Sequence, residues 1–175
     1  MQTILDVKKT IREVPNFPKE GINFIDITTA IKDKVAMKSI IDYFVDEFKN
    51  EQIDYVAGIE SRGFIFGMPI AYCLGCGFIP IRKPKKLPAA TIGVDYELEY
   101  GTDRIEIHAD AIEEGKRVLV IDDLLATGGT AAAACELIKK AKGELVGVGF
   151  LIELEFLKGR EKLPKDTRIV TMLKY

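Results

Sequence analysis

The sequence is poor in the residues that build metal sites and disulfide frameworks. It contains three cysteines, one histidine and no tryptophan in 175 residues. Three thiols cannot form a network of disulfides. Cys73 and Cys76 form a C-x-x-C pair, but His108 is the only histidine, and a zinc site normally takes four ligands. Because the pair ends an apolar, helix-like run, we expect both thiols to be buried and structural.

Long apolar stretches and a strong net charge are also absent. No run approaches the ~20 apolar residues of a membrane-spanning helix, and the amphipathic N-terminus lacks the apolar core of a signal peptide. A cytoplasmic protein with no membrane partner is therefore expected. The formal net charge is −2, so the overall field does not favour nucleic acid. Any polyanionic ligand would need a local basic cluster.

What remains is the composition of an ordinary globular protein. Hydrophobic residues make up 47% of the chain and charged residues 30%, which is typical of such proteins. A chain of 175 residues is long enough to bury one well-packed core. The sequence contains no repeat, low-complexity tract or linker, so residues 1–175 are expected to form a single domain.

Hydrophobic periodicity predicts alternating helices and strands. Helices are predicted over residues 3–14, 36–50, 63–73 and 130–142, and strands over 54–59, 77–83, 118–121, 146–154 and 168–173. A loop rich in proline and glycine occupies residues 15–28, and residues 91–108 alternate like a β-hairpin. Short apolar strands between helices indicate an α/β fold: a mostly parallel, twisted sheet flanked by helices, from which the hairpin projects.

One loop carries the clearest chemical signal. In RVLVIDDLLATGGTAAAA, from Arg117 to Ala134, an apolar strand is followed by two acids, a glycine turn and a small-residue helix. The backbone N–H groups at the start of that helix suit an anion such as phosphate, and Gly128 and Gly129 allow the backbone to approach it closely. The turn lacks the lysine of a Walker phosphate-binding loop.

The acids directly before this turn narrow the choice of ligand. A phosphate next to Asp122 and Asp123 is unfavourable unless something lies between them. A ribose phosphate meets this need, because its hydroxyls donate to the carboxylates while its phosphate lies in the turn. From the residues alone an alternative stays open, in which the acid pair binds a metal or only caps the helix.

The run V-L-V-I-D-D-L-L-A-T-G-G-T resembles the motif with which type I phosphoribosyltransferases bind 5-phosphoribosyl 1-pyrophosphate (PRPP). That motif has four apolar residues, two acids, two apolar residues and then A/D-T-G-x-T. The resemblance implies that Asp122 and Asp123 hold the ribose. It also implies that the 5-phosphate is held by Ala126, Thr127, Gly128, Gly129 and Thr130.

Two features of the sequence point to one branch of this family. Ala126 stands where enzymes for 6-oxopurines typically carry an aspartate. The segment NFPKEGINFIDIT, residues 16–28, is similar to the F-P-x-P-G-x-x-F-x-D-I segment of adenine phosphoribosyltransferases, with Glu20 in place of the second proline. The resemblance therefore implies an adenine substrate and an N-terminal purine-binding segment.

Four residues are implied in binding the base. By resemblance, Phe24 stacks on one face of adenine and Leu124 covers the other, while the backbone of Asn23 and Ile25 meets its polar edge. Stacking on an aromatic ring suits any purine, so the edge contacts would supply the selectivity. Judged without the resemblance, Phe24 is an ordinary core residue.

Two further motifs are implied in binding the leaving group. The E-S-R-G run at residues 60–63 and the R-K-x-x-K-L-P pattern at residues 82–88 resemble the family's pyrophosphate-binding segments. The residues implied are Ser61, Arg62, Arg82, Lys83 and Lys86. The alternative for the basic cluster is a solvated turn. With so few basic residues and no interleaved aromatics, it does not predict a nucleic-acid partner.

The L-E-Y-G run at residues 98–101 resembles the family's mobile hairpin. By carry-over, Glu99 is the catalytic residue that handles the proton and Tyr100 is its closing neighbour, although a surface-strand glutamate would look the same. The activity implied is purine salvage: adenine and PRPP give AMP and pyrophosphate. Mg²⁺ is expected to enter with PRPP without direct protein ligands, and a homodimer is expected.

Two other functions stay open. One is a PRPP-binding regulator without catalysis, but such regulators carry an added N-terminal DNA-binding domain, and only about fifteen residues precede the purine segment here. The other is a transferase for xanthine, guanine or hypoxanthine, against which Ala126 and the Phe24 segment argue.

Overall fold

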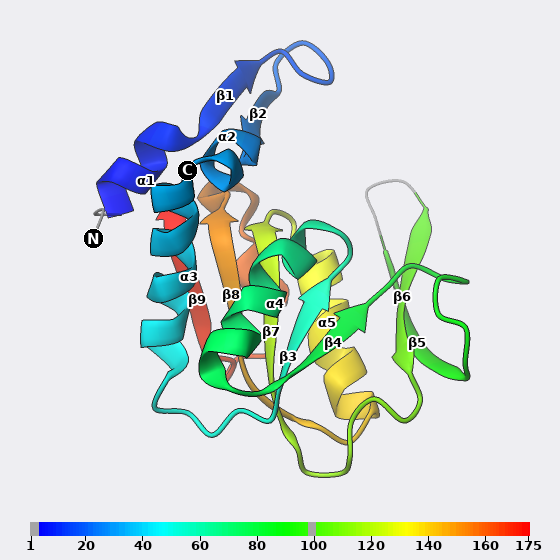
Figure 1. The fold of residues 1–175 in the computed structure, drawn as a ribbon. Helices are drawn as coiled ribbons and strands as arrows, with labels where there is room; N and C mark the ends of the chain where they lie inside the picture. The colour runs from blue at the N-terminus through cyan, green and yellow to red at the C-terminus, as the bar shows by residue number, and fades with distance from the viewer. Residues whose placement is uncertain (1–3, 98–100) are drawn as a thin grey trace.

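A five-stranded parallel sheet forms the centre of the computed structural model, which describes residues 4–97 and 101–175 (Figure 1). All neighbouring strands of this sheet run parallel, so the predicted α/β fold is confirmed. In spatial order the strands are β4 (Gly77–Ile81), β3 (Tyr55–Ile59), β7 (Arg117–Leu125), β8 (Glu144–Glu153) and β9 (Ile169–Lys174).

Helices cover both faces of the sheet. Successive side chains of a strand point to opposite faces. In β7, Leu119 and Ile121 accordingly join the core beneath α3 and α4, whereas Val118 and Val120 join the core beneath α5. Burial on both faces explains why the strand sequences are continuously apolar. The three helices are α3 (Lys34–Phe48), α4 (Arg62–Leu74) and α5 (Gly129–Lys140).

The helices begin close to where the sequence predicts. The α3 helix starts two residues earlier than expected because Asp33 caps it: its carboxylate accepts hydrogen bonds from the backbone N–H of Val35 (2.8 Å) and Ala36 (2.9 Å). The α4 helix ends at Gly75, whose φ of +70° stops the helix in the left-handed conformation that glycine adopts readily.

The N-terminal segment differs from the prediction. The expected helix over residues 3–14 is wrong after Thr10, because the chain forms a strand from Arg12 that pairs with residues 23–26. Val14 precedes a proline, which disfavours helix there, and Arg12 donates to the carboxylate of Asp26 (Nε–Oδ2 2.9 Å) across the pair. The elements are α1 (Ile4–Thr10), β1 (Arg12–Pro15), β2 (Asn23–Asp26) and α2 (Thr28–Lys32).

The predicted hairpin projects from the side of the molecule (Figure 1). It consists of the antiparallel strands β5 (Thr91–Glu97) and β6 (Thr102–His108). One face of the hairpin packs into the α5 core through Val94, Tyr96 and Ile105. Glu99 and Tyr100, the two predicted catalytic residues, lie outside the described residues.

Three smaller differences concern local exposure and strand ends. Cys73 is exposed, which corrects the expected burial of both thiols: it follows Tyr72, 85% exposed, on the outward side of α4. Strand β7 extends to Leu125, so the two acids lie within the strand and not after it. Two 3₁₀ turns, η1 (Glu155–Leu157) and η2 (Gly159–Lys162), precede β9.

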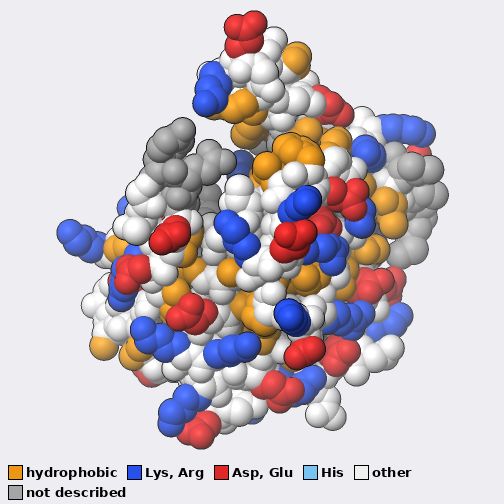
Figure 2. Space-filling view, turned by 180° about the vertical axis from the view of Figure 1, so that it is seen from behind, with side chains coloured by type: hydrophobic (Ala, Val, Ile, Leu, Met, Phe, Trp, Pro, Cys, Tyr) orange, Lys and Arg blue, Asp and Glu red, His pale blue; other side chains and the backbone are white. Residues whose placement is uncertain are grey.

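The surface bears on possible partners. On the face in Figure 2, basic and acidic side chains are interspersed and form no large patch of one sign. No helix in residues 4–97 or 101–175 is both long and apolar enough to cross a membrane.

Candidate active site

The order of the strands places a crevice between β3 and β7. The chain leaves β3 toward β4 on one side and leaves β7 toward β8 on the other, so the order reverses between these two neighbours. In open parallel sheets, ligands bind beyond the carboxyl ends of the strands at such a point. The E-S-R-G run follows β3 and the loop of residues 126–130 (the glycine loop) follows β7, so both predicted anion-binding segments meet there.

Three hollows adjoin at this crevice. The central one, about 290 Å³, is lined by both aspartates, Arg62, Lys83 and Thr130. A second, about 120 Å³, lies beneath β2 and shares Arg62 and Asp123 with the first. A third, about 90 Å³, follows the glycine loop and shares Asp122 and Thr130 with the first. The central hollow therefore connects an apolar compartment to a backbone-lined one.

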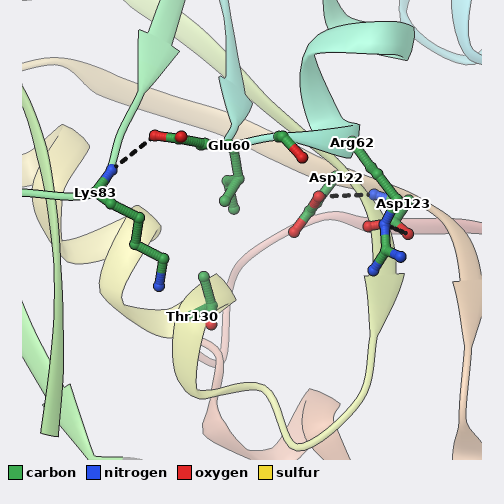
Figure 3. A pocket seen from close by; sticks show the side chains of 8 residues that line it. Glu60, Arg62, Lys83, Asp122, Asp123 and Thr130 are labelled. Carbon is green, nitrogen blue, oxygen red and sulfur yellow. Dashed lines mark hydrogen bonds and ion pairs between the residues drawn. The ribbon is translucent and has the colours of Figure 1, made fainter. Parts of the chain in front are cut away.

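The acid pair lies at the centre of this arrangement. Figure 3 shows both carboxylates beside Arg62, with Lys83 and Thr130 directed into the same hollow. Asp123 is buried and forms an ion pair with Arg62 (Nε–Oδ2 2.7 Å). Asp122 accepts a hydrogen bond from the backbone N–H of Asp123 (2.9 Å). Because neighbouring strand residues point to opposite faces, Asp123 reaches the apolar compartment and Asp122 reaches the glycine loop.

Burial makes both carboxylates costly to ionise. Desolvation raises the pKa of Asp122 well above its usual range, and the adjacent Asp123 raises it further. Desolvation also raises the pKa of Asp123, although Arg62 partly offsets the effect. A group that donates hydrogen bonds to the pair, such as a sugar diol, would relieve this cost. Perturbed carboxylates in a crevice mark a candidate functional site.

The glycine loop presents backbone donors at the start of α5. Gly128 adopts φ +81° and is the N-cap residue of the helix. It has no side chain with which to cap the first N–H groups, so these remain available to an anion. Thr130 lines both the central hollow and the loop hollow, and the exposed Thr127 lines the loop hollow. Ala126, Gly129 and the rest of the predicted set surround the same hollow.

The apolar compartment contains all four residues predicted to bind the base. Phe24 and Leu124 line it, together with Asn23 and Ile25. The β1–β2 pair that carries three of them lies over the carboxyl edge of the sheet (Figure 1). A side-chain bond from Asn23 to Glu13 (2.7 Å) links the two strands. The structure thus brings the purine segment to Asp123, although Leu124 lies 99 positions after Ile25 in the sequence.

The five residues predicted to bind pyrophosphate divide into two groups. Ser61, Arg62 and Lys83 line the central hollow, whereas Arg82 and the exposed Lys86 do not. Arg82 instead donates to the carboxylate of Glu60 (Nε–Oε2 3.1 Å).

Lys83 is held against the hairpin at the pair formed by Tyr96 and Asp103, one position before the two strands end. Its ammonium group contacts the carboxylate of Asp103 and donates to the hydroxyl of Tyr96 (3.1 Å). Burial works to lower the pKa of Lys83, but these bonds outweigh it and leave the pKa raised. Lys83 is therefore a fixed positive charge that links the hairpin to the central hollow.

Some residues of the site were not predicted. Glu60 lines the central hollow, where it accepts a hydrogen bond from the backbone N–H of Lys83 (3.0 Å) and positions the start of the basic turn. Its position in the E-S-R-G run was the available signal. Ile152 joins the apolar compartment because it lies opposite Leu124 in the parallel register, which only the topology reveals. Within residues 4–97 and 101–175, no group of three or more His, Cys, Asp or Glu could hold a metal ion.

Comparison with known proteins agrees with this geometry. Residues 27–175 match the phosphoribosyl transferase domain family. The chain is 58% identical over 171 residues to the adenine phosphoribosyltransferase of Thermosynechococcus vestitus, covering 98% of this chain and 100% of that relative. The chain belongs to the adenine phosphoribosyltransferase family.

Solved structures of that family share the fold. The adenine phosphoribosyltransferase of Thermoanaerobacter pseudethanolicus superposes with a TM-score of 0.94 at 48% identity, covering 99% of this chain and 100% of that one. The Saccharomyces cerevisiae enzyme, solved with an imino-altritol bisphosphate and adenine, gives a TM-score of 0.91 at 42% identity, covering 97% of each chain. The predicted family resemblance is confirmed.

Proposed function

We propose that this chain transfers the 5-phosphoribosyl group of PRPP to N9 of adenine and releases AMP and pyrophosphate. The observation that carries the proposal is the order of the three hollows. An apolar compartment fits a purine, the acid pair fits a ribose, and the glycine loop fits a phosphate. The yeast relative solved with adenine and a sugar-like bisphosphate supports the same pair of ligands.

The base would lie between Phe24 and Leu124. Its polar edge would face the backbone of Asn23 and Ile25, which line the same compartment. In the proposed pose N9 faces the central hollow, which adjoins this compartment at Arg62 and Asp123. The pose requires no protein nucleophile, so catalysis would rest on positioning and electrostatics.

PRPP would extend across the other two hollows. The ribose hydroxyls would donate to Asp122 and Asp123, and the 5-phosphate would accept hydrogen bonds from the glycine loop. Ser61, Arg62 and Lys83 would face the pyrophosphate. Fixed donors of this kind are worth roughly 3 kcal/mol each in the transition state. Arg82 and Lys86 are proposed to contact the pyrophosphate from the basic turn once it is bound.

In the reaction, the bond from C1 of the ribose to pyrophosphate breaks as N9 of adenine bonds to C1. Positive charge develops on the sugar beside the acid pair, and the pyrophosphate takes up the electron pair beside Arg62 and Lys83. We propose that Mg²⁺ enters the central hollow with PRPP and takes no direct ligands from the protein. When bound with PRPP, Mg²⁺ would neutralise charge on the leaving group.

Glu99 is proposed to accept the N9 proton, and Tyr100 to close over the site. Substituting Glu99→Gln should lower kcat far more than it weakens PRPP binding. Turnover equal to wild type would remove Glu99 from the chemistry.

Pyrophosphate release from PRPP and Mg²⁺ tests the proposed activity. Release that requires adenine and forms AMP is the expected result. PRPP binding without release in the presence of adenine would assign the chain to the regulators instead.

We also propose that the enzyme acts as a homodimer in the cytoplasm. Ile65, Met68 and Tyr72 form an exposed apolar stripe on α4, at the spacing of one helix face, and a second copy would cover it. Free thiols at Cys73, Cys76 and Cys135 suit a reducing compartment. Light scattering should give a dimer for wild type and for Phe156→Glu, an exposed control, but a monomer for Tyr72→Glu. A wild-type monomer would contradict the proposal.

A further inference from the structure

A turn near the C-terminus lies directly behind the glycine loop. A Cβ atom on Gly128 would collide with the carbonyl oxygen of Gly159. A Cβ atom on Gly159 would collide with the carbonyl oxygen of Ala126 and would lie 3.0 Å from the amide nitrogen of Gly128. The turn of residues 158–160 (the brace turn) thus supports the loop by backbone contact, with no room for a side chain between them.

The two glycines are needed for different reasons. Gly128 has φ +81°, so its backbone conformation itself favours glycine. Gly159 has no positive φ of this kind. It is buried in η2, and only the lack of space excludes a side chain there. A methyl group at Gly159 would therefore push on the loop without straining the turn's own backbone.

An ion pair between the buried Glu153 and the partly exposed Arg160 holds the brace turn in place. Glu153 is 3% exposed. Its carboxylate accepts hydrogen bonds from Arg160 (Nε 2.5 Å, Nη2 2.8 Å) and from the hydroxyl of Thr171 (3.1 Å). Burial acts to raise the pKa of Glu153, but these bonds outweigh it and leave the pKa lowered. The charge is thus fixed in a bidentate pair, the strongest common geometry.

This ion pair lies next to the carboxyl end of β7, where the glycine loop begins. Glu153 lies opposite Leu125 in the register of β8 and β7, and Leu125 is the last residue before the loop. The backbone N–H of Leu154 also donates to the carbonyl of Leu125 (2.9 Å). Loop, brace turn and ion pair therefore form one unit.

We propose that Gly159 and Arg160 are positioning residues for the 5-phosphate of PRPP. Arg160 ties the brace turn to Glu153, and Gly159 transmits that position to the glycine loop, so that the loop's N–H groups converge on the phosphate. The proposal rests on the proposed function, because it takes the loop to be the phosphate site. A displacement of about 1 Å in such a cradle can cost 10²-fold in rate.

The test compares two glycine variants with wild-type enzyme. In Gly159→Ala the new methyl group meets the loop. In the matched control Gly147→Ala, the new methyl group lies 2.9 Å from the carbonyl oxygen of Arg168. Gly147 is in the half of β8 that is distant from Glu153 and the brace turn. Melting temperature, kcat and both KM values are measured, together with the Kd of ribose 5-phosphate by calorimetry. We expect both variants to lose stability, and only Gly159→Ala to raise the KM of PRPP and the Kd of ribose 5-phosphate, by about tenfold or more.

A second pair of variants decides the matter if Gly159→Ala fails to fold. Arg160→Lys keeps the positive charge but loses the guanidinium group that donates two hydrogen bonds to Glu153. The control Arg168→Lys removes a guanidinium group from the surface ion pairs with Glu47 and Glu51. Only Arg160→Lys should weaken ribose 5-phosphate, while Thr171→Ser, which keeps the hydroxyl, should behave as wild type.

The proposal is overturned if the folded brace-turn variants bind ribose 5-phosphate within twofold of their controls. An equal rise in the KM of adenine and PRPP would also overturn it, because that pattern reports general loosening. Failure of the proposed function looks different: wild type itself would then form no AMP.

Discussion

Replacing Asp122 by asparagine should change stability and substrate binding in opposite directions. In the free protein, Asp122 is a poorly solvated carboxylate next to a second one, and both effects raise its pKa. Asparagine removes the charge but keeps an oxygen that can accept the hydrogen bond from the N–H of Asp123. The free energy of unfolding should therefore rise near pH 7, and each kcal/mol of relief appears as about 2–4 °C in Tm.

The same substitution removes a charge-assisted acceptor for a ribose hydroxyl. Hydrogen bonds to charged groups contribute about 1.5–3 kcal/mol, so PRPP affinity should fall roughly 10- to 150-fold. Differential scanning fluorimetry and calorimetric PRPP titration measure the two effects on one preparation, with Asp110→Asn in an exposed turn as control. A variant that binds PRPP as tightly as wild type, or that melts lower, would refute the assignment of Asp122 to the ribose.

Three further predictions follow from the site. The pKa values of Asp122 and Asp123 are raised in the folded protein, so protonation of the two carboxylates stabilises the fold at low pH. This stabilisation is lost as pH rises through the raised pKa values. PRPP binds the ionised carboxylates, so the affinity for PRPP should fall as pH falls through the same values. At a pH near those raised values, titration in two buffers of different ionisation enthalpy should show proton release on binding, and less release for Asp122→Asn, which keeps Asp123. Arg62→Ala deprives Asp123 of its cation and should cost about 1–3 kcal/mol in denaturant unfolding; no change would remove the ion pair from the stability argument. Phe24→Ala should weaken adenine by about 1–3 kcal/mol at an unchanged KM for PRPP, and an equal loss for both substrates would contradict a stacking role.

The main elements could be predicted from the sequence because their signals are local. Continuous apolar runs give the strands of the parallel sheet, and helix-period spacing with a cap such as Asp33 gives the helices. The β1 strand could not be predicted this way. Its conformation depends on pairing with residues 23–26 and on the ion pair between Arg12 and Asp26, both of which are contacts distant in sequence.

The residues of the site show the same difference between local signals and contacts distant in sequence. Residues contiguous in a motif, such as those from Asp122 to Thr130, could be assigned to one place together, and residues of this run line one hollow. The pairing of Arg82 with Glu60 and that of Lys83 with Asp103 depend on which strands lie side by side, so these contacts could not be predicted from the sequence. The brace turn at Gly159 is missed for the same reason.

The most direct measurement is an activity assay in which the pure enzyme, PRPP and Mg²⁺ are mixed with adenine, hypoxanthine, guanine or xanthine, one base at a time. Both pyrophosphate release and the nucleotide product are recorded. Release with adenine alone, with AMP as the product, is the predicted result, because it requires the acid pair, the glycine loop and the Phe24 compartment to act on one substrate pair. Release with the 6-oxopurines but not with adenine would keep the PRPP site and contradict the assignment of Ala126 and Phe24 to adenine.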